Sequence, residues 1–412
     1  MNPMRYIDFV NLKYTPTPND LICEFYLEPQ GLSLEEAAGG VAAESSVGTW
    51  TELSTMKKYV EKLHATVFEI ANNDVKIAYP IELFEKGNMP NLLSSVAGNV
   101  FGLAALKNLR LNDLRLPEEL VRSFKGSRYG IEGIRRILKV PKRPLVGTII
   151  KPKLGLNIDD HAEVAYEAWA GGCDLVKDDE NLASQSFNKF AVRLRKTLRM
   201  RDRAERKTGE RKMYLVNITA ETEEMLRRAQ LVKDSGGEYA MVDIVTCGFS
   251  SIQTLRNKNL GLVLHAHRAG HAAFTRNPKH GISMKVISRI VRILGLDQLH
   301  VGAVVGKMSE TREEVLENVK ALKEDLYGLK PVLPVASGGL YPRLVPSLID
   351  IFGNDIVIQA GGGIHGHKDG TCAGARAMRQ AVDATLEEKS LTEYATSHNE
   401  LRAALETWPA KC

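Results

Sequence analysis

The sequence is poor in cysteine and in long apolar stretches, and both shortages exclude classes of protein. The 412 residues include five cysteines, an odd number, and no Cys-x-x-Cys pair. Neither a disulfide framework nor a structural zinc site is therefore expected. No run of 18 apolar residues occurs, and the first residues show no basic segment followed by an apolar one. The sequence therefore predicts no membrane span and no secretion signal, and we expect a cytoplasmic protein.

The composition is that of an ordinary globular protein. Hydrophobic residues make up 44% and charged residues 25% of the chain, which excludes disordered, collagen-like and coiled-coil proteins. The net charge of +5, from 55 basic and 50 acidic residues, is too small to indicate nucleic-acid binding by itself. Partners must therefore be argued from individual sites.

The pattern of apolar runs changes near residue 125. Before that point, strand-like runs at 21–29 and 75–84 alternate with a helical segment at 33–44, which predicts a small α+β domain. After it, eight short β-rich runs recur, separated by helical patterns. These runs lie at 145–153, 174–180, 213–219, 239–245, 261–267, 299–305, 332–338 and 355–362. Eight strand–helix units in about 250 residues favour an α/β fold of the (β/α)8 TIM-barrel type over an open doubly wound sheet.

We therefore expect two domains. Residues 1–125 would form a smaller α+β domain of ferredoxin-like type, and residues 126–412 would form the catalytic barrel with a C-terminal helical tail. One barrel helix is predicted to follow Ser283 as its N-cap and to end at Gly295. Another is predicted to begin at Asp159 or Asp160 and to end at Gly171 and Gly172.

Most of the predicted barrel strands end in ionisable or glycine residues. They are Lys151 and Lys153 after the first strand, Lys177 to Glu180 at the second, His265, His267 and Arg268 at the fifth, His300, Gly306 and Lys307 with the sixth, Ser337, Gly338 and Gly339 at the seventh, and Gly361, Gly362 and Gly363 at the eighth. A barrel built for stability alone needs no such residues at one rim. The pattern therefore predicts a catalytic mouth at the carboxyl ends of the strands.

The second strand end allows two interpretations. Residues two apart on a strand share a face, so Lys177 and Asp179 point together into the mouth, and Glu180 follows where the strand ends. In the first interpretation Lys177 is a salt-bridge partner that neutralises the two carboxylates. In the second, the Lys177 amine has reacted with CO₂ to form a carbamate, so that three oxygen ligands meet at one Mg²⁺. Spacing alone does not choose between them.

Glycine-rich loops after the last two strands are where barrels commonly bind phosphate, because backbone N–H groups approach the oxygens closely there. Gly361, Gly363 and Gly366 also spell GxGxxG, but no later strand supplies the acidic residue of a dinucleotide fold. The segment 302–308, GAVVGKM, is one residue short of a phosphate-binding P-loop and lacks the Ser or Thr after its lysine. It is interpreted either as a mobile lid that carries Lys307 or as a plain surface turn.

The histidine pair His265 and His267 favours either a metal pair or one catalytic and one buried histidine. Metal-dependent amidohydrolases combine such a pair with a carbamylated lysine, but in the opposite chain order. The basic stretch 193–212 has three acidic residues and no aromatic residue for base stacking. It is therefore predicted to be a solvated outer helix, with no nucleic-acid partner.

Several segments, taken in order, resemble the large subunit of ribulose-1,5-bisphosphate carboxylase/oxygenase (RuBisCO). They are GTIIKPKLGL (147–156), GGCDLVKDDEN (171–181), HAHRAGH (265–271), HVGAVVGKM (300–308), ASGG (336–339) and GGG (361–363). The segments AAESSVGTW (42–50) and AGNVFGL (97–103) extend the similarity to the amino-terminal part. The short chain and the stretch HAAFTRNPKHGISM resemble the archaeal form III type.

The resemblance implies a carboxy-lyase that adds CO₂, or O₂ as a monooxygenase, to the enediolate of ribulose 1,5-bisphosphate and cleaves the product to 3-phosphoglycerate. It implies Mg²⁺ held by carbamylated Lys177, Asp179 and Glu180, with CO₂ as the activator that forms the carbamate. The carbamate would remove the C3 proton. The other implied catalytic residues are Lys151 for protons at C2, His267 for proton transfer in enolisation and hydration, and Lys307 for the carboxylate formed from CO₂.

The substrate-binding residues are implied in the same way. Lys153 would support Lys151 electrostatically. One phosphate site would consist of Arg268, His300 and Ser337, and the other of Gly339, Gly361 and Gly362, completed by Thr49 and Trp50. Gly338 is implied as a further substrate-binding residue. Glu44, Thr49, Trp50 and Asn99 would reach the barrel mouth of a neighbouring subunit. A homodimer, or a higher assembly of dimers, is therefore expected, with no membrane partner.

The sequence departs from the family pattern at several positions. Val47 and Ala303 stand where threonine is usual, Gly270 stands where methionine is usual, and GGGIHGHKDG replaces GGGTLGHP. The segment after Lys307 reads MSE instead of LEG or MEG, so Ser309 and Glu310 lie beside the implied CO₂ lysine. The alternative function is that of a RuBisCO-like enolase or isomerase of sulfur salvage, which typically lacks several groups corresponding to Lys151, His300, Lys307 or Asn99. All four are present here.

Overall fold

The computed structural model describes residues 5–51, 53–306 and 310–409. Their contacts divide the chain into two compact units. The amino-terminal unit runs to Lys125 and also takes in Gly270–Leu294 and Asp325–Leu329, and the barrel unit comprises Gly126–Ala269, Gly295–Glu324 and the chain from Lys330 onward. The boundary between residues 125 and 126 stays a prediction, because two later segments belong by their contacts to the amino-terminal unit.

The amino-terminal unit is a mixed sheet with helices. Its elements follow the order β1 (Leu21–Pro29), α1 (Leu34–Glu44), β2 (Thr66–Ala71), β3 (Asp74–Tyr79), α2 (Met89–Val96), β4 (Leu106–Arg115), α3 (Glu118–Arg122), α10 (Ala272–Thr275), β10 (Gly281–Ile282) and α11 (Met284–Leu294). The sheet order is β10-β4-β1-β3-β2, in which β10 lies parallel to β4 and the other neighbours are antiparallel. The first six elements therefore have the βαββαβ order of the predicted ferredoxin-like type.

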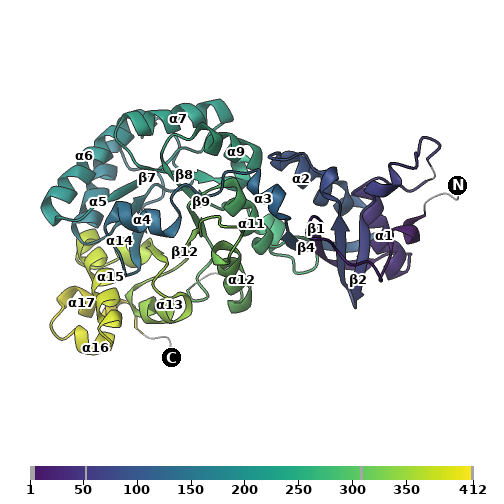
Figure 1. The fold of residues 1–412 in the computed structure, drawn as a ribbon. Coiled ribbons are helices and arrows are strands. Elements are labelled where there is room, and N and C mark those ends of the chain that lie inside the picture. The colour runs from purple at the N-terminus through teal and green to yellow at the C-terminus, as the bar shows by residue number, and fades with distance from the viewer. Residues whose placement is uncertain (1–4, 52, 307–309, 410–412) are drawn as a thin grey trace. The chain divides into compact units, whose positions relative to one another are not determined.

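The barrel unit closes eight parallel strands into one sheet, which confirms the predicted (β/α)8 architecture (Figure 1). The strands are β5 (Leu145–Ile149), β6 (Leu175–Lys177), β7 (Met213–Asn217), β8 (Tyr239–Asp243), β9 (Val263–His267), β11 (Gln298–His300), β12 (Leu333–Ser337) and β13 (Val357–Ala360). Each pairs in parallel with its neighbours, and β11 pairs with β9 while β13 pairs with β5 to complete the ring.

Helices surround the barrel strands and form the end of the chain (Figure 1). They are α4 (Gly130–Leu138), α5 (Ile158–Ala170), α6 (Phe190–Thr208), α7 (Thr222–Asp234), α8 (Ile244–Cys247), α9 (Phe249–Lys258), α12 (Arg312–Lys323), α13 (Val345–Phe352), α14 (Gly362–His365), α15 (Gly370–Leu386), α16 (Leu391–Tyr394) and α17 (Asn399–Thr407). Among the described residues, no helix combines the length and the apolar content needed to cross a bilayer. The cysteines of the described residues are free.

Two predicted helix starts can be compared with the structure. Ser283 is confirmed, since its Oγ accepts a hydrogen bond from the backbone N–H of Val286 (3.2 Å) just ahead of α11. The predicted start of α5 at Asp159 or Asp160 is wrong by one or two residues. Asn157 is the N-cap, because its side-chain oxygen accepts from the N–H groups of both aspartates at 2.9 Å. An asparagine satisfies two free N–H groups of a first turn as well as an aspartate does.

The barrel core lies toward the amino-terminal ends of the strands. Apolar side chains from seven strands meet there and pack against Ile131, Ile134 and Leu138 of α4. The strand residues are Leu145, Leu175, Met213, Leu215, Tyr239, Met241, Val263, Leu333, Val335 and Val357. Because side chains two apart on a strand share a face, the residues two positions further along these strands also point into the barrel.

Asp178 points away from that interior and ties the end of β6 to the helix layer. Its carboxylate accepts from Tyr214 Oη (2.6 Å), the Asn217 backbone N–H (3.0 Å) and Arg193 Nε (3.2 Å), and it is hydrogen bonded to His161 Nε2 (3.1 Å). Burial alone would raise the pKa of Asp178, but Arg193 and the hydrogen bonds from His161 and Tyr214 lower it well below its ordinary value. One carboxylate therefore fixes α5, α6 and β7 around the predicted site.

The basic stretch 193–212 is only partly the solvated helix that was predicted. Most of it forms α6, on which Arg195, Arg199 and Arg203 are exposed. Arg193 is instead fully buried against Asp178, and Arg201 is also buried. Lys212, which follows the helix, is buried as well, so the prediction was wrong for these three residues. The composition of the stretch does not show which basic residues find buried partners on other elements, as Arg193 does in Asp178 and Lys212 in the Cys173 carbonyl oxygen.

We expect Asp178→Ala to lower the free energy of unfolding by about 3–5 kcal/mol, because Arg193 then stays buried without a counter-charge. The lowered pKa also predicts that the wild-type contribution is present near neutral pH and is lost as the pH falls through the folded-state value. Urea unfolding at several pH values measures both effects. Glu406→Ala, which breaks the exposed Lys368–Glu406 pair, is the control and should cost less than about 1 kcal/mol. Equal losses in the two variants would contradict this assignment.

Candidate active site

The carboxyl ends of the barrel strands place polar side chains on the inner face. By the alternation that puts Leu175, Leu215 and Met241 in the core, Lys177, Asn217 and Asp243 point inward. The same alternation applies to His265 and His267 after Val263, to Ser337 after Val335 and to Gln359 after Val357. The barrel interior is thus apolar at one end and polar at the other, as the catalytic-mouth prediction requires.

Lysines and carboxylates cluster at the ends of β5 and β6. Lys151 Nζ donates to Asp179 Oδ2 at 2.8 Å, and Lys153 Nζ lies 4.0 Å from Asp179 Oδ1 and 3.6 Å from Glu180 Oε1. Lys177 Nζ lies 3.6 Å from Glu180 Oε2. The structure therefore brings together five of the predicted site residues on two neighbouring strand ends.

Lys177 and Asp179 are the two buried members of this cluster, and Lys177 is the buried amine. Its side chain is 1% exposed, and its Nζ donates to the carbonyl oxygen of Asp178 at 2.7 Å. Burial lowers the pKa of Lys177, although Glu180 and Asp179 act in the opposite direction. Burial alone would raise the pKa of Glu180, but the charges of Lys177 and His267 lower it to about 2. The glutamate is therefore an anion next to an amine that burial makes easier to deprotonate.

Asn217, at the end of β7, was missed by the sequence analysis. Its Nδ2 donates to three carbonyl oxygens of the loop after β6, those of Asp179 (3.4 Å), Glu180 (2.9 Å) and Leu182 (3.1 Å). This one side chain fixes the backbone that carries both carboxylates. A signal was present, since Asn217 is the last residue of a barrel strand.

Asp243, at the end of β8, was missed in the same way. Its Oδ1 lies 2.6 Å from His267 Nδ1 and accepts from the Ala269 backbone N–H at 3.1 Å. His267 Nε2 in turn lies 3.6 Å from Glu180 Oε2. Asp243 therefore orients the imidazole, so that the other ring nitrogen faces the carboxylate cluster.

The two histidines of β9 have different surroundings. His265 is fully buried; its Nδ1 lies 2.8 Å from Gln298 Oε1 and its Nε2 lies 2.9 Å from His300 Nε2. His300 Nδ1 is hydrogen bonded to Ser337 Oγ at 2.7 Å. Burial lowers the pKa of His265 to about 3 and that of His300 well below its ordinary value. His265 thus belongs to a neutral buried chain, and its contacts favour the interpretation of one buried and one catalytic histidine over a metal pair.

The predicted phosphate residues gather around the next strands. Arg268, which follows β9, donates from Nη2 to Glu310 Oε1 at 2.7 Å. Gly338 and Gly339 follow β12 with φ values of 115° and 73°, a conformation that favours glycine. A Cβ on Gly361, after β13, would lie 3.2 Å from Lys151 Cε, which brings the last strand end next to the lysine of the first. Gly362 begins α14, and nothing lies within 4 Å of the position that a Cβ on it would take.

The other predicted residues lie elsewhere. Lys307 is outside the described residues. Glu44, Thr49, Trp50 and Asn99 belong to the amino-terminal unit. There, Glu44 accepts from Tyr6 Oη at 2.9 Å, Thr49 and Trp50 line a hollow of about 450 Å³, and the Trp50 side chain is exposed.

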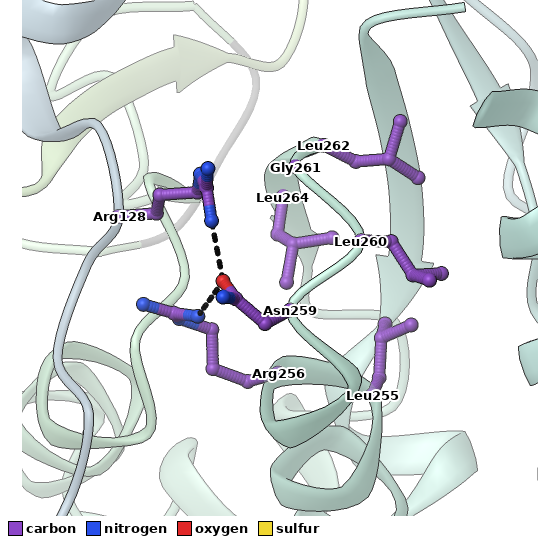
Figure 2. A pocket seen from close by; sticks show the side chains of 8 residues that line it. All are labelled: Arg128, Leu255, Arg256, Asn259, Leu260, Gly261, Leu262 and Leu264. Carbon is purple, nitrogen blue, oxygen red and sulfur yellow. Dashed lines mark hydrogen bonds between the residues drawn. The ribbon is translucent and has the colours of Figure 1, made fainter.

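The hollow at the other end of the barrel is not a candidate site. Arg128 and Arg256 both donate to Asn259 Oδ1 where α9 leads into β9, beside four leucines (Figure 2). Its volume of about 10 Å³ holds no more than a single water molecule.

Two family models match the chain and together cover nearly all of it. The model described as "Ribulose bisphosphate carboxylase large chain, catalytic domain" matches residues 130–408, and the model described as "Ribulose bisphosphate carboxylase large chain, N-terminal domain" matches residues 8–120. The chain belongs to the RuBisCO large-chain family.

Archaeal proteins are among the full-length relatives in this family. The protein named "Ribulose bisphosphate carboxylase" of Methanocaldococcus jannaschii is 51% identical over 98% of this chain and 100% of its own length. The protein of that name from Pyrococcus furiosus is 52% identical over 98% of this chain and 97% of its own length. The predicted archaeal character is thus confirmed.

Solved RuBisCO structures agree with this assignment. The octameric enzyme of Pyrococcus horikoshii, in complex with sulfate ion, has a TM-score of 0.97 and 50% identity over 100% of this chain and 99% of that one. The dimeric RuBisCO of Hyperthermus butylicus has a TM-score of 0.91 and 45% identity over 98% of this chain and 99% of that one. The first of these two relatives is thus an octamer and the second a dimer.

Proposed function

We propose that the protein is a ribulose-1,5-bisphosphate carboxylase/oxygenase that adds CO₂ or O₂ to the enediolate of ribulose 1,5-bisphosphate and cleaves the adduct, with 3-phosphoglycerate as the product of carboxylation. The observation that carries the proposal is the cluster of Lys177, Asp179 and Glu180 at the end of β6, with Lys151 and Lys153 directly against it. Full-length relatives that are 51% and 52% identical to this chain, and that are named for this activity, support the proposal.

The residues present fit Mg²⁺ only if Lys177 is modified. Within the described ranges, no group of three or more His, Cys, Asp or Glu side chains is placed to hold a metal ion. Asp179 and Glu180 supply two hard oxygen ligands of the kind that Mg²⁺ prefers. Lys177 would supply the third after its amine bonds to CO₂, and burial favours the neutral amine that this reaction requires. We therefore propose a carbamate on Lys177 as part of the metal site.

Mg²⁺ held there would place a positive charge beside the substrate carbonyl and make the neighbouring C–H group more acidic. The chain's own residues would move the protons. Lys151, which donates to Asp179, would handle protons at C2, with Lys153 as a second cation beside the same carboxylate. His267, oriented by Asp243, would assist proton transfer during enolisation and hydration.

The two phosphates of the substrate would bind on separate sides of the mouth. Arg268, His300 and Ser337 with Gly338 form the first side, where a guanidinium and side-chain donors suit a dianion. Gly339, Gly361 and Gly362 form the second, where phosphate oxygens can approach backbone N–H groups without a side chain in the way. Lys307 would meet the carboxylate that develops when CO₂ adds.

We also propose a homodimer, or an assembly of dimers, as the active form. Glu44, Thr49, Trp50 and Asn99 lie in the amino-terminal unit, and Trp50 leaves 81% of its surface exposed. Tryptophan is one of the residues that are enriched in protein–protein interfaces, and this supports a partner subunit over Trp50. A cytoplasmic location is proposed as well, since the free cysteines suit a reducing compartment.

We expect the protein, preincubated with bicarbonate and Mg²⁺, to convert ribulose 1,5-bisphosphate and labelled CO₂ into labelled 3-phosphoglycerate. Lys177→Arg should abolish this conversion, because a guanidinium keeps its proton and does not form a carbamate. Thermal unfolding of the variant checks that the fold is intact. Substrate consumption by the wild type without label in the product would favour the enolase alternative.

Lys307→Ala should end carboxylation but spare exchange of the substrate's C3 proton with solvent, because Lys307 is proposed to act only after enolisation. Isotope exchange at C3 and carboxylation are measured on the same preparation. Equal loss of both reactions would contradict the role proposed for Lys307.

Asp243→Asn should lower kcat by about tenfold to a hundredfold, the range known for carboxylates that orient metal-bound histidines, because Asp243 orients His267 in the same way. The amide retains an oxygen for the Ala269 N–H but removes the charge next to His267. KM for the bisphosphate should change little, since Asp243 faces the imidazole and not a proposed phosphate site. A variant with wild-type kcat would show that the contact is structural only.

A further inference from the structure

The carboxylate of Glu310 is hydrogen bonded to Arg268, the arginine proposed above for phosphate binding. Glu310 stands where the family pattern in the sequence analysis has glycine. Its Oε1 accepts from Arg268 Nη2 at 2.7 Å. An acidic side chain that this chain adds to the family pattern therefore contacts the guanidinium proposed for this phosphate site.

The ion pair is buried. The side chains of Arg268 and Glu310 are 6% and 15% exposed. A Cβ on Gly302, just beyond β11, would lie 3.5 Å from both Arg268 Nη2 and Glu310 Cδ. The pair thus packs directly over a backbone without a side chain, where water screens the charges little.

Each member of the pair keeps one polar atom unused. Arg268 Nη1 and Glu310 Oε2 are buried and have no hydrogen-bond partner among the described residues. The contact therefore uses one bond where an arginine and a carboxylate commonly form two. Buried polar atoms without partners cost free energy. Both side chains would therefore gain from a ligand or a position that supplies the missing hydrogen bonds.

The arginine belongs to the same neighbourhood as the other residues of that phosphate site. His300 is hydrogen bonded to Ser337 at 2.7 Å. After burial and the charges of His265, His267 and Lys177, the charge of Arg268 also contributes to the lowered pKa of His300. A dianion that reaches His300 and Ser337 is therefore within the field of Arg268.

We propose that Glu310 is an internal competitor of the substrate phosphate: its carboxylate holds Arg268 in the free enzyme, and the phosphate must displace it to bind. The inference rests on the proposed function, because it takes Arg268 as a phosphate ligand. Glu310 thereby sets the affinity for the bisphosphate without contacting it in the bound state.

Competition is favoured over a positioning role for Glu310. If Glu310 stayed on Nη2 while phosphate bound Nη1, a carboxylate and a dianion would share one buried guanidinium and repel each other. Glu310 Oε2 would also remain without a donor. Displacement removes the repulsion and lets the phosphate use both Nη groups.

The test is the affinity of the full-length protein for inorganic phosphate, measured by calorimetry, together with KM for ribulose 1,5-bisphosphate. Glu310→Gln should tighten phosphate binding by about tenfold and lower KM, since the amide bonds Arg268 without a charge. Glu313→Gln removes the same charge from an exposed position on α12 and should change neither value. A gain in affinity does not arise from misfolding.

Arg268→Ala completes the experiment as a double-mutant cycle. Phosphate binding should weaken in this variant, and Glu310→Gln added to it should have no further effect. Unchanged or weaker binding in the single Glu310 variant would overturn the proposal, as would a gain that persists without Arg268. Because the cycle measures binding, it can fail while carboxylation succeeds, and an inactive enzyme would refute the proposed function without deciding the competition.

Discussion

The buried carboxylate of Asp178 is the contact on which the rest of the site depends. It lies between Lys177 and Asp179 in the chain but points to the opposite side of the strand, where a tyrosine, a histidine, an arginine and a backbone N–H surround it. Because its neighbours must then face inward, anchoring one residue on the outside orients two on the inside. β6 spans only Leu175–Lys177, so its few ladder hydrogen bonds alone would hold this geometry weakly.

The interior behind that anchor is a balance of opposite charges. Lys151, Lys153 and Lys177 surround Asp179 and Glu180, so that neither sign is buried alone. Burying an unpaired charge is far more costly than burying a pair. The proposed carbamate on Lys177 would change this balance. Lys177 would then be an anion beside Asp179 and Glu180, and a divalent cation is suited to compensate three such negative groups.

Much of this arrangement is predictable from the sequence, because it follows from the spacing of apolar residues and from the order of strands and helices along the chain. The run at 21–29 is β1 without a change of boundary, and seven of the eight barrel runs contain a strand. The run at 299–305 overlaps β11 (Gln298–His300) only at its first two residues. β2 and β4 were not predicted, since their mixed polar and apolar residues lack a strong alternation.

Asn217 and Asp243 were overlooked because each is a single polar residue after an apolar run. Their importance comes from partners on neighbouring strands, which no spacing along one strand displays. Arg193 is a further case, in which a charged residue within a basic helix is buried by a carboxylate from another element.

The short strand β10 has a consequence for how the chain is made. β4 pairs with β1 on one side and with Gly281–Ile282 on the other, yet these two residues follow five of the eight barrel strands in the sequence. On the ribosome, the amino-terminal sheet therefore emerges with the open edge of β4 exposed until most of the barrel strands have been synthesised. An open edge invites pairing with other nascent chains, so the order of translation leaves a window for aggregation that the finished fold no longer shows.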